Sequence, residues 1–332
     1  MRILITGVHG FVGRAISAFL APEHKIYGVD IVAPENPNVA RTYSWQDLEA
    51  DLASDSERII PEVDAIIHLA AMVHDVKDAA NEEVYYTVNT ELTKKIYDWY
   101  LKFGAGRFIF FSTVKAAADS VEGVLTEDVV PHPVGAYGCS KLQAEAYILS
   151  HLPEAAMPFE APATEDKRFV YILRPCMIHG SGNKGNLPLL YNIVRKGIPW
   201  PLGEYDNLRT FTSIENLLFV VKGLLDKDIA SGIYNMGDDE PLSTNELVQM
   251  ICASLGRRAH IWHLPKWLVS AVAGLGGVLH LPLNPERLRK LTENYISSNA
   301  KIKAALGVDR MPVSAREGMM HTFEAFRDDR GR

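Results

Sequence analysis

Cysteine is scarce in this sequence. Only Cys139, Cys176 and Cys252 occur among 332 residues, and they are far apart. An odd number without paired spacing argues against a disulfide framework and against a cysteine-based zinc site. The histidines are equally scattered. We therefore expect no bound metal and a reducing, cytoplasmic environment.

Excess positive charge and long apolar runs are also lacking. The formal net charge of -7 argues against nucleic acid as a partner. The N-terminal run "MRILITGVHGFVG" is short and interrupted by glycines, unlike a signal peptide. The most apolar stretch, Trp267 to Leu283, lies at the short edge of a membrane span and contains Gly-Gly, His and Pro. We expect no integral span. A helix packed on the protein's own core is favoured there, with peripheral membrane contact as the alternative.

Short apolar runs alternate with helical patterns through the first half of the chain. Continuous rather than alternating hydrophobicity indicates strands covered on both faces, as in a parallel sheet. The predicted strands are Arg2–Thr6, Lys25–Asp30, Val63–Ala71, Arg107–Ser112 and Arg168–Pro175. This alternation predicts an α/β fold with a Rossmann-type, doubly wound parallel sheet over residues 1–175. Residues 176–332 are expected to form a smaller substrate-binding region, from which some segments return to the sheet.

The segment "TGVHGFVG" places three glycines between the first strand and the following helix. Such a turn lets the backbone approach a pyrophosphate, and the helix N-terminus offers unpaired N–H groups. The position directly after a strand strengthens this interpretation. We predict that Gly7, Gly10, Phe11, Val12 and Gly13 bind a dinucleotide.

Asp30 ends the second predicted strand, 17 residues after Gly13. A carboxylate at this position accepts hydrogen bonds from the adenosine ribose hydroxyls and repels a 2′-phosphate. No arginine follows closely to neutralise such a phosphate. The predicted cofactor is therefore NAD rather than NADP.

The segment "YGCSK" places Tyr137 and Lys141 one turn apart on a predicted helix. A free phenol has a pKa of about 10 and is a poor base at neutral pH. A nearby ammonium stabilises the phenolate and lowers that pKa. With a hydroxyl from "FFST" holding the substrate oxygen, the pair is suited to interconverting an alcohol and a ketone. By itself the Tyr–Lys spacing also occurs by chance on many helices.

With these motifs in this order, the sequence resembles the extended short-chain dehydrogenase/reductase family over nearly its whole length. The most similar members are nucleotide-sugar 4-epimerases and the related 4-ketoreductases. The supporting motifs are "TGVHGFVG", "DAIIHLAA", "YYTVNTE", "FFSTVKA", "YGCSK", "RPCMIHG", "GNLPLL" and "RTFTSIEN". The resemblance implies that Thr113 is catalytic with Tyr137 and Lys141, and that Ser112 lines the nicotinamide. It also implies cofactor contacts at Leu69, Ala70, Ala71 and Asn89.

The resemblance extends to the substrate, with one departure. Sugar 4,6-dehydratases of this family carry Thr-Asp-Glu where this chain has Thr113, Val114 and Lys115, which disfavours water elimination. Family members commonly dimerise through two helices, here 90–103 and 137–150, and we expect a homodimer. The apolar stripe of the first helix is formed by Leu92, Ile96, Trp99 and Tyr100. Implied substrate residues are Asn186, Leu187 and Arg209, with Arg287 or Arg289 as a second phosphate ligand.

These motifs are compatible with three functions. The first is an NAD-dependent 4-epimerase of a nucleotide sugar, a UDP-hexose or a UDP-N-acetylhexosamine, acting through a transient 4-ketone. The second is a 4-ketoreductase of a 4-keto-6-deoxy nucleotide sugar, which uses the same residues. The third is a dinucleotide-sensing protein without activity, which would have no use for an activated phenol.

Overall fold

The computed structural model describes residues 1–332 except 74–81, 157–158, 160–167, 184, 279–284 and 329–332. Within the described residues, the largest sheet is formed by β1 (Arg2–Thr6), β2 (Lys25–Val29), β3 (Arg41–Tyr43), β4 (Ala65–His68), β5 (Arg107–Phe111), β7 (Phe169–Pro175) and β11 (Gly232–Met236). Its seven strands are parallel, in the order β11-β7-β5-β4-β1-β2-β3. Because the strand order runs outward from β1 in both directions, the predicted doubly wound fold is confirmed.

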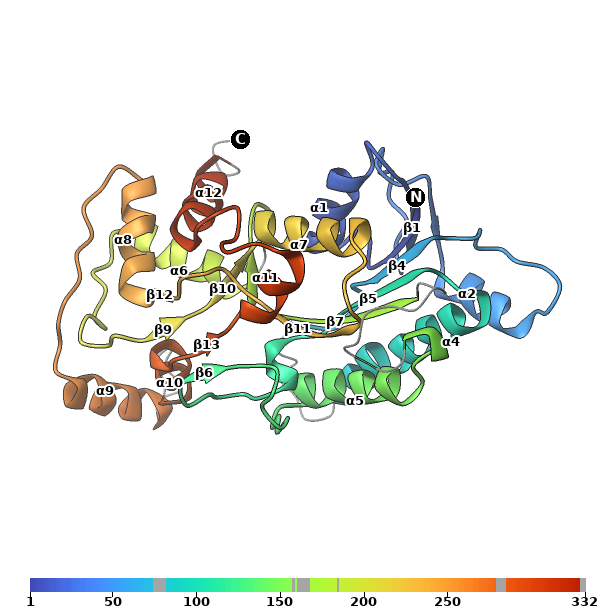
Figure 1. The fold of residues 1–332 in the computed structure, drawn as a ribbon. Coiled ribbons are helices and arrows are strands. Elements are labelled where there is room, and N and C mark those ends of the chain that lie inside the picture. The colour runs from blue at the N-terminus through green and yellow to red at the C-terminus, as the bar shows by residue number, and fades with distance from the viewer. Residues whose placement is uncertain (74–81, 157–158, 160–167, 184, 279–284, 329–332) are drawn as a thin grey trace.

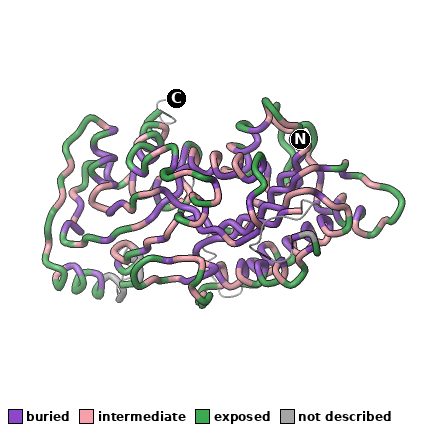
Figure 2. The backbone as a smooth tube through the Cα atoms, in the orientation of Figure 1, coloured by how far each residue is buried: buried purple, intermediate pink, exposed green. Residues whose placement is uncertain are grey.

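Helices cover both faces of this sheet (Figure 1). One face carries α1 (Phe11–Leu20), α7 (Ile214–Asp226) and α11 (Ala300–Leu306), and the other carries α2 (Trp45–Ala53), α4 (Leu92–Phe103) and α5 (Ala136–Ser150). Successive strand residues point to opposite faces of the sheet: Ile3 and Ile5 pack against the layer of α1, α7 and α11, and Leu4 packs against the layer of α2, α4 and α5. Both faces are therefore apolar, which explains the uninterrupted hydrophobic runs (Figure 2).

The apolar stripe of α4 faces the sheet. Ile96, Trp99 and Tyr100 are fully buried in the second layer, so they are not available to a partner subunit. Before α4 the chain forms α3 (Glu82–Tyr85) and a π-helical turn, η2 (Tyr86–Glu91). The N–H of Leu92 donates to the carbonyl of Thr87, five residues earlier, which marks the wider π turn.

The remaining elements pack into a second core beyond the carboxyl ends of the strands. Its helices are α6 (Asn186–Arg195), α8 (Thr244–Ser254), α9 (Lys266–Val278), α10 (Pro285–Thr292) and α12 (Ala315–Asp328). Three short strand pairs accompany them: β6 (Val124–Leu125) with β13 (Ile296–Ser297), β8 (Met177–His179) with β10 (Phe211–Ser213), and β9 (Leu208–Arg209) with β12 (Leu242–Ser243). Single 3₁₀ turns are η3 (Val114–Ala116) and η4 (Glu154–Ala156).

Tyr295 joins this second region to the sheet. Its hydroxyl lies 3.0 Å from the carbonyl oxygen of Val114 and 2.8 Å from that of Ala118. Its own carbonyl accepts from the N–H of Thr210 at 2.9 Å, directly after β9. The loop that follows β5 is thereby tied to the strand that carries Arg209.

Candidate active site

The turn after β1 requires glycine at two positions. Gly7 has a φ of +67°, in the left-handed region that favours glycine. A Cβ on Gly13 would lie 2.3 Å from the carbonyl oxygen of Gly7, so any side chain there would displace the turn. Gly10 caps α1, whose first N–H groups are available to an anion. This backbone cradle fits the pyrophosphate of a dinucleotide.

The loop after β4 lies against this turn. Thr6 Oγ1 accepts from the backbone N–H groups of Leu69 and Ala70, at 3.2 and 3.1 Å. A Cβ on Gly7 would approach the Ala70 backbone to 3.0 Å, so the two loops are in close contact. Ala71 follows in the same loop. The predicted cofactor residues of β1 and β4 therefore lie together at the point where the strand order reverses.

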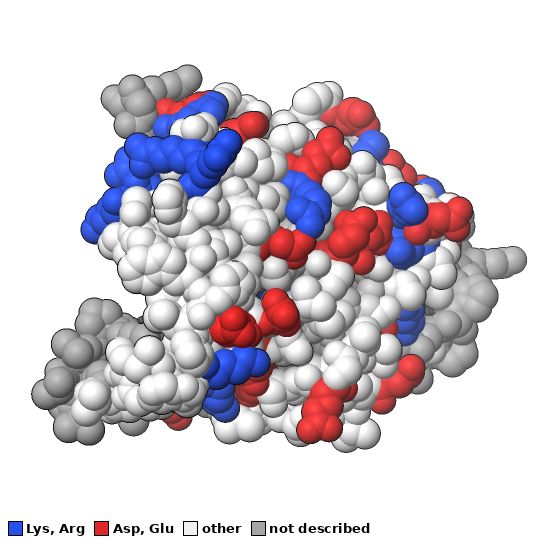
Figure 3. Space-filling model, turned by 90° about the vertical axis from the view of Figure 1, so that its left-hand side faces the viewer, with Lys and Arg blue, Asp and Glu red and all other residues white. Residues whose placement is uncertain are grey.

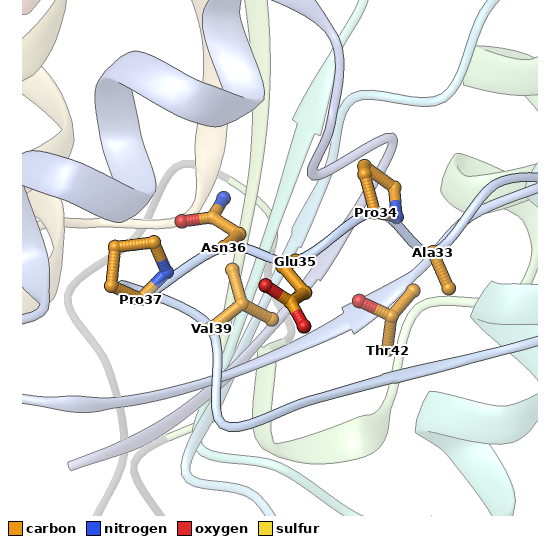
Figure 4. Close-up of a pocket in the computed structure, with 7 residues that line it drawn as sticks. All are labelled: Ala33, Pro34, Glu35, Asn36, Pro37, Val39 and Thr42. Atoms are coloured by element: carbon orange, nitrogen blue, oxygen red, sulfur yellow. The ribbon is translucent and has the colours of Figure 1, made fainter.

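Asp30 is half-buried at the end of β2, next to the glycine turn. Its carboxylate accepts from the backbone N–H of His9 at 3.0 Å and of Ile31 at 2.7 Å. The loop that follows encloses a cavity of about 430 Å³, lined by residues between Ala33 and Val39 and by Thr42 (Figure 4). The glycine cradle, the carboxylate and this adjoining cavity together fit NAD, with the adenosine end toward Asp30.

Thr113 and Tyr137 meet at the carboxyl end of the sheet. Thr113 is buried directly after β5 and caps η3, accepting from the N–H of Lys115 at 3.2 Å. Tyr137 lies close to Thr113, and the Tyr85 ring stands edge-on to the Tyr137 ring with 6.2 Å between the ring centres. Burial raises the pKa of Tyr137, and the neighbouring Thr113 hydroxyl opposes that rise.

Lys141 lies on the same helix but does not lower the pKa of Tyr137 in this form of the protein. Its Nζ donates to the carbonyl of Phe111 at 2.8 Å and sits 4.7 Å from the centre of the Phe110 ring. Burial lowers the pKa of Lys141 to about 7, although the Glu145 carboxylate acts in the opposite direction. Without cofactor, Tyr137 is therefore a protonated phenol. Its activation as a base requires a further positive charge, which the nicotinamide of bound NAD would supply.

The structure contains a buried charge network next to Lys141 that the sequence did not predict. Glu145 accepts from Arg174 Nε at 3.0 Å and Nη2 at 2.6 Å, and it also accepts from the Ser112 hydroxyl. Glu145 and Arg174 are each no more than 2% exposed. Ser112 is thus held by Glu145, one turn beyond Lys141. The signal for Glu145 is its spacing of four residues from Lys141; Arg174 is a charge within an apolar strand.

Asn89 fixes the catalytic helix from the other side. It lies in η2 and is fully buried. Its side chain accepts from the N–H of Met72 at 2.8 Å and donates to the Ser140 hydroxyl at 3.0 Å. Thr90 donates to the Ser140 carbonyl at 2.8 Å. Asn89 therefore connects the loop after β4 to the helix of Tyr137 and Lys141, where its contact with a ribose remains a prediction.

The expected substrate residues are more dispersed. Arg209 is half-buried on β9, and its Nε donates to the carbonyl of Glu293 at 3.1 Å. Asn186 is exposed at the first residue of α6. Leu187 is buried in the second core, so only its backbone is available to a substrate. Arg289 is exposed on α10, while the side chain of Arg287 lies outside the described part of the structure.

The chain is similar to known proteins over most of its length. UDP-glucose 4-epimerase of Vibrio cholerae is 28% identical over 335 aligned residues, covering 98% of this chain and 95% of that protein. N-acetyl-alpha-D-glucosaminyl-diphospho-ditrans,octacis-undecaprenol 4-epimerase of Escherichia coli O157:H7 is 28% identical, covering 80% of this chain and 75% of that protein. The structure of UDP-glucuronic acid 4-epimerase from Bacillus cereus in complex with NAD superposes with a TM-score of 0.71 at 19% identity, covering 99% of both chains.

A family model also matches more than half of the chain. The sequence model of one enzyme family matches residues 3–237, which include β1 to β11 and every residue of the glycine turn and the Thr113–Tyr137–Lys141 set. NAD is the cofactor of that family. On this match and on the doubly wound sheet, the chain belongs to the NAD dependent epimerase/dehydratase family.

Proposed function

We propose that the protein is an NAD-dependent 4-epimerase of a nucleotide sugar, a UDP-hexose or a UDP-N-acetylhexosamine. The observation that carries this proposal is that Thr113 and Tyr137 lie together on the side of Lys141, at the strand ends next to the glycine turn. The near full-length similarity to a UDP-glucose 4-epimerase supports it.

The residues of this chain handle the proton at O4 of the sugar. Thr113 orients the O4 hydroxyl, Tyr137 takes its proton when the ketone forms, and Tyr137 returns the proton when the alcohol forms again. Lys141 holds the nicotinamide ribose and stabilises the phenolate. Bound NAD supplies the hydride chemistry at C4. Arg209, with its fork of donors, is suited to the sugar diphosphate.

A 4-ketoreductase is the second candidate, because the same Thr113, Tyr137 and Lys141 would protonate O4 of a 4-keto sugar. The difference lies in the cofactor, which a reductase consumes in each turnover and an epimerase retains. Dehydration is less well supported. Val114 and Lys115 stand where dehydratases carry two acids, and Lys115 Nζ binds the carbonyl of Asp119 and lies over the Tyr295 ring.

A substrate panel separates these candidates. The purified protein is incubated with UDP-sugars and their 4-keto derivatives, and NMR identifies the products. An epimerase converts a UDP-sugar to its C4 epimer without added NADH and carries NAD through purification. Consumption of NADH with only the 4-keto sugars would replace the epimerase by the reductase. No turnover in any arm, with NAD bound, would favour the sensing protein.

The setting of the enzyme is part of this proposal. Cys139, Cys176 and Cys252 are free thiols, which suits a reducing cytoplasm.

A homodimer through α4 and α5 would use their outer faces, where the Tyr147 hydroxyl donates to Asp98 at 2.5 Å. Light scattering at micromolar concentration tests the dimer.

A further inference from the structure

Helix α9 is apolar on nearly all sides but is buried along only a narrow line. Val269 and Ala273 pack into the second core, one turn apart. Three large side chains are open to solvent: Trp267 is 72% exposed, Val272 49% and Leu275 64%. A helix that is hydrophobic all round is normally covered by protein or by lipid. Among the described residues, the outward faces of α9 therefore lack the cover that their composition calls for.

The segment leading into α9 extends this apolar surface. It forms parallel and antiparallel bridges with residues 200–202, and it presents Trp262 with 55% of its surface exposed. Figure 1 places α9 at the outer margin of the molecule, away from the large sheet. Figure 3 faces this end of the molecule and shows uncharged atoms toward the lower left, with acidic and basic side chains beside them and a group of basic side chains near the upper left.

Charge sets the same stretch apart from the rest of the chain. Residues 247–285 contain no Asp or Glu, although the chain has 41 acidic residues and a formal charge of -7. They contain Arg257, Arg258 and Lys266. Arg258 and Lys266 are exposed, four residues before Trp262 and directly before Trp267 in the chain. The stretch itself is positively charged in an acidic protein, although Glu204 lies against His263 next to Trp262, and its basic side chains complement an anionic partner.

The length and charge of α9 select among possible occupants. Its 13 residues are too few to cross a bilayer, and none of the helices in the described ranges is long and apolar enough to do so. In a symmetric contact with a second copy, the same patch would face itself and bring Arg258 and Lys266 close to their own counterparts. An apolar helix flanked by Trp, Lys and Arg is typical of a segment that lies in the plane of a membrane interface.

We propose that Trp262, Trp267, Val272 and Leu275, together with Arg258 and Lys266, form a surface that docks on a lipid bilayer with anionic headgroups. We refer to these six residues as the α9 surface. The tryptophans and aliphatic side chains enter the headgroup boundary, and the basic side chains bind the lipid phosphates. The docking is independent of the function proposed above, because it requires no turnover.

The α9 surface lies next to the expected substrate residues. Helix α9 packs on α10, and Leu288 of α10 shares the core of Val269 and Ala273. The chain after α10 reaches Glu293, whose carbonyl accepts from Arg209. A docked α9 would therefore hold the diphosphate-binding end of the site close to the membrane surface, within reach of a sugar diphosphate carried on a lipid.

Vesicle flotation of the full chain tests this proposal. Phosphatidylcholine vesicles are compared with vesicles that also contain phosphatidylglycerol. The wild type should float with the anionic vesicles and bind neutral ones more weakly. Trp267→Ser should weaken binding by at least about tenfold, and Arg258→Gln and Lys266→Gln by about fivefold each. Phe19→Ser, which changes an exposed aromatic residue on α1, should bind like the wild type.

Binding of NAD and turnover of a UDP-sugar without vesicles should be unchanged in all these variants, which shows that they fold. Wild-type protein that stays in solution with both vesicle types would overturn the proposal. Equal loss of binding in Phe19→Ser and Trp267→Ser would overturn the assignment to α9. A concentration-dependent dimer that Trp267→Ser abolishes, without vesicle binding, would show that a second copy covers this face instead.

Discussion

The two ends of this molecule hold their polar groups in different ways. At the sheet end, Lys141, Glu145 and Arg174 are buried, and each contacts protein partners that fix it. At the other end, Arg209 is half-buried, Asn186 is exposed and α9 is open to solvent. The rigid end carries the groups for proton transfer, while the open end carries the groups expected to select a substrate. Chemistry and specificity are thus built on separate structural supports.

The largest effect should come from the rigid end. Tyr137→Phe removes one oxygen and should leave the fold and NAD binding intact. If the phenol moves the proton, turnover falls by about 10²–10⁴-fold, the usual range for a positioned acid or base. Thr113→Ala should cost less, because Thr113 orients the substrate oxygen without exchanging the proton. Steady-state rates on the active sugar measure both. Wild-type turnover in Tyr137→Phe would mean that another group moves the proton.

Glu145→Gln should be the most damaging change to stability. It leaves the Arg174 charge buried without its counterion, which typically costs about 3–5 kcal/mol. The matched control is Asp228→Asn, which breaks the more exposed pair with Arg107 and should cost about 1 kcal/mol or less. Urea denaturation compares the two free energies of unfolding. Equal losses would show that the buried network is no more important than a surface pair.

Asp30→Ala tests the cofactor contact at the end of β2, next to the glycine turn. Losing a charged hydrogen-bond acceptor costs about 1.5–3 kcal/mol, so NAD affinity should fall tens-fold and the preference over NADP should narrow. Calorimetric titration with both cofactors measures this. Equal affinity of the wild type for NAD and NADP would contradict the role given to Asp30.

At the open end, Arg209→Lys keeps the charge but loses the planar fork of donors. We expect KM for the nucleotide sugar to rise about tenfold with little change in kcat. The control is Arg289→Lys on α10, for which no change is expected. If Arg289→Lys instead raises KM while Arg209→Lys does not, the diphosphate ligand lies on α10.

The last prediction concerns the pH dependence of stability, where the change is gradual. Burial of Lys141 holds its pKa at about 7, whereas the unfolded chain has a lysine near 10.4. Above about pH 7 the unfolded state binds more protons at this site, so the burial penalty shrinks as pH rises. The wild type therefore gains at most about 1.4 kcal/mol of unfolding free energy per pH unit above pH 7, and Lys141→Met does not. Any stability advantage of Lys141→Met over the wild type should narrow as the pH rises. If the difference between their free energies of unfolding is the same at every pH, the lowered pKa of Lys141 is refuted.

The sequence predicted the rigid end well, because its elements obey local rules. β1, β2, β4, β5 and β7 are short buried runs, and their apolar residues serve two layers at once. β3 and β11 were not predicted. β3 has three residues at an edge, and β11 contains a glycine and an asparagine among its five residues, so neither stands out by hydrophobicity. The glycine turn was predicted from spacing, and its crowding at Gly13 explains that spacing.

The network around Lys141 could not be predicted in the same way. The partners of Glu145 come from β7 and from the end of β5, and only the folded sheet brings them together. The state of Tyr137 without cofactor could not be read from the sequence either: the sequence places Lys141 one turn away, but the Phe111 carbonyl binds its ammonium, and burial raises the pKa of Tyr137. The stripe on α4 has the correct period, yet periodicity does not say whether a sheet or a subunit covers it.

The π turn at Tyr86–Glu91 has a consequence for how this helix tolerates length changes. A π turn holds one more residue than an α turn, so it behaves as a one-residue insertion absorbed within the helix. Deleting one residue there would restore a regular α turn and leave the helical segments on either side in phase. Asn89 and Thr90 lie within the π turn itself, so their contacts with Ser140 would be lost or shifted, although every apolar residue of α4 would keep its place on the sheet.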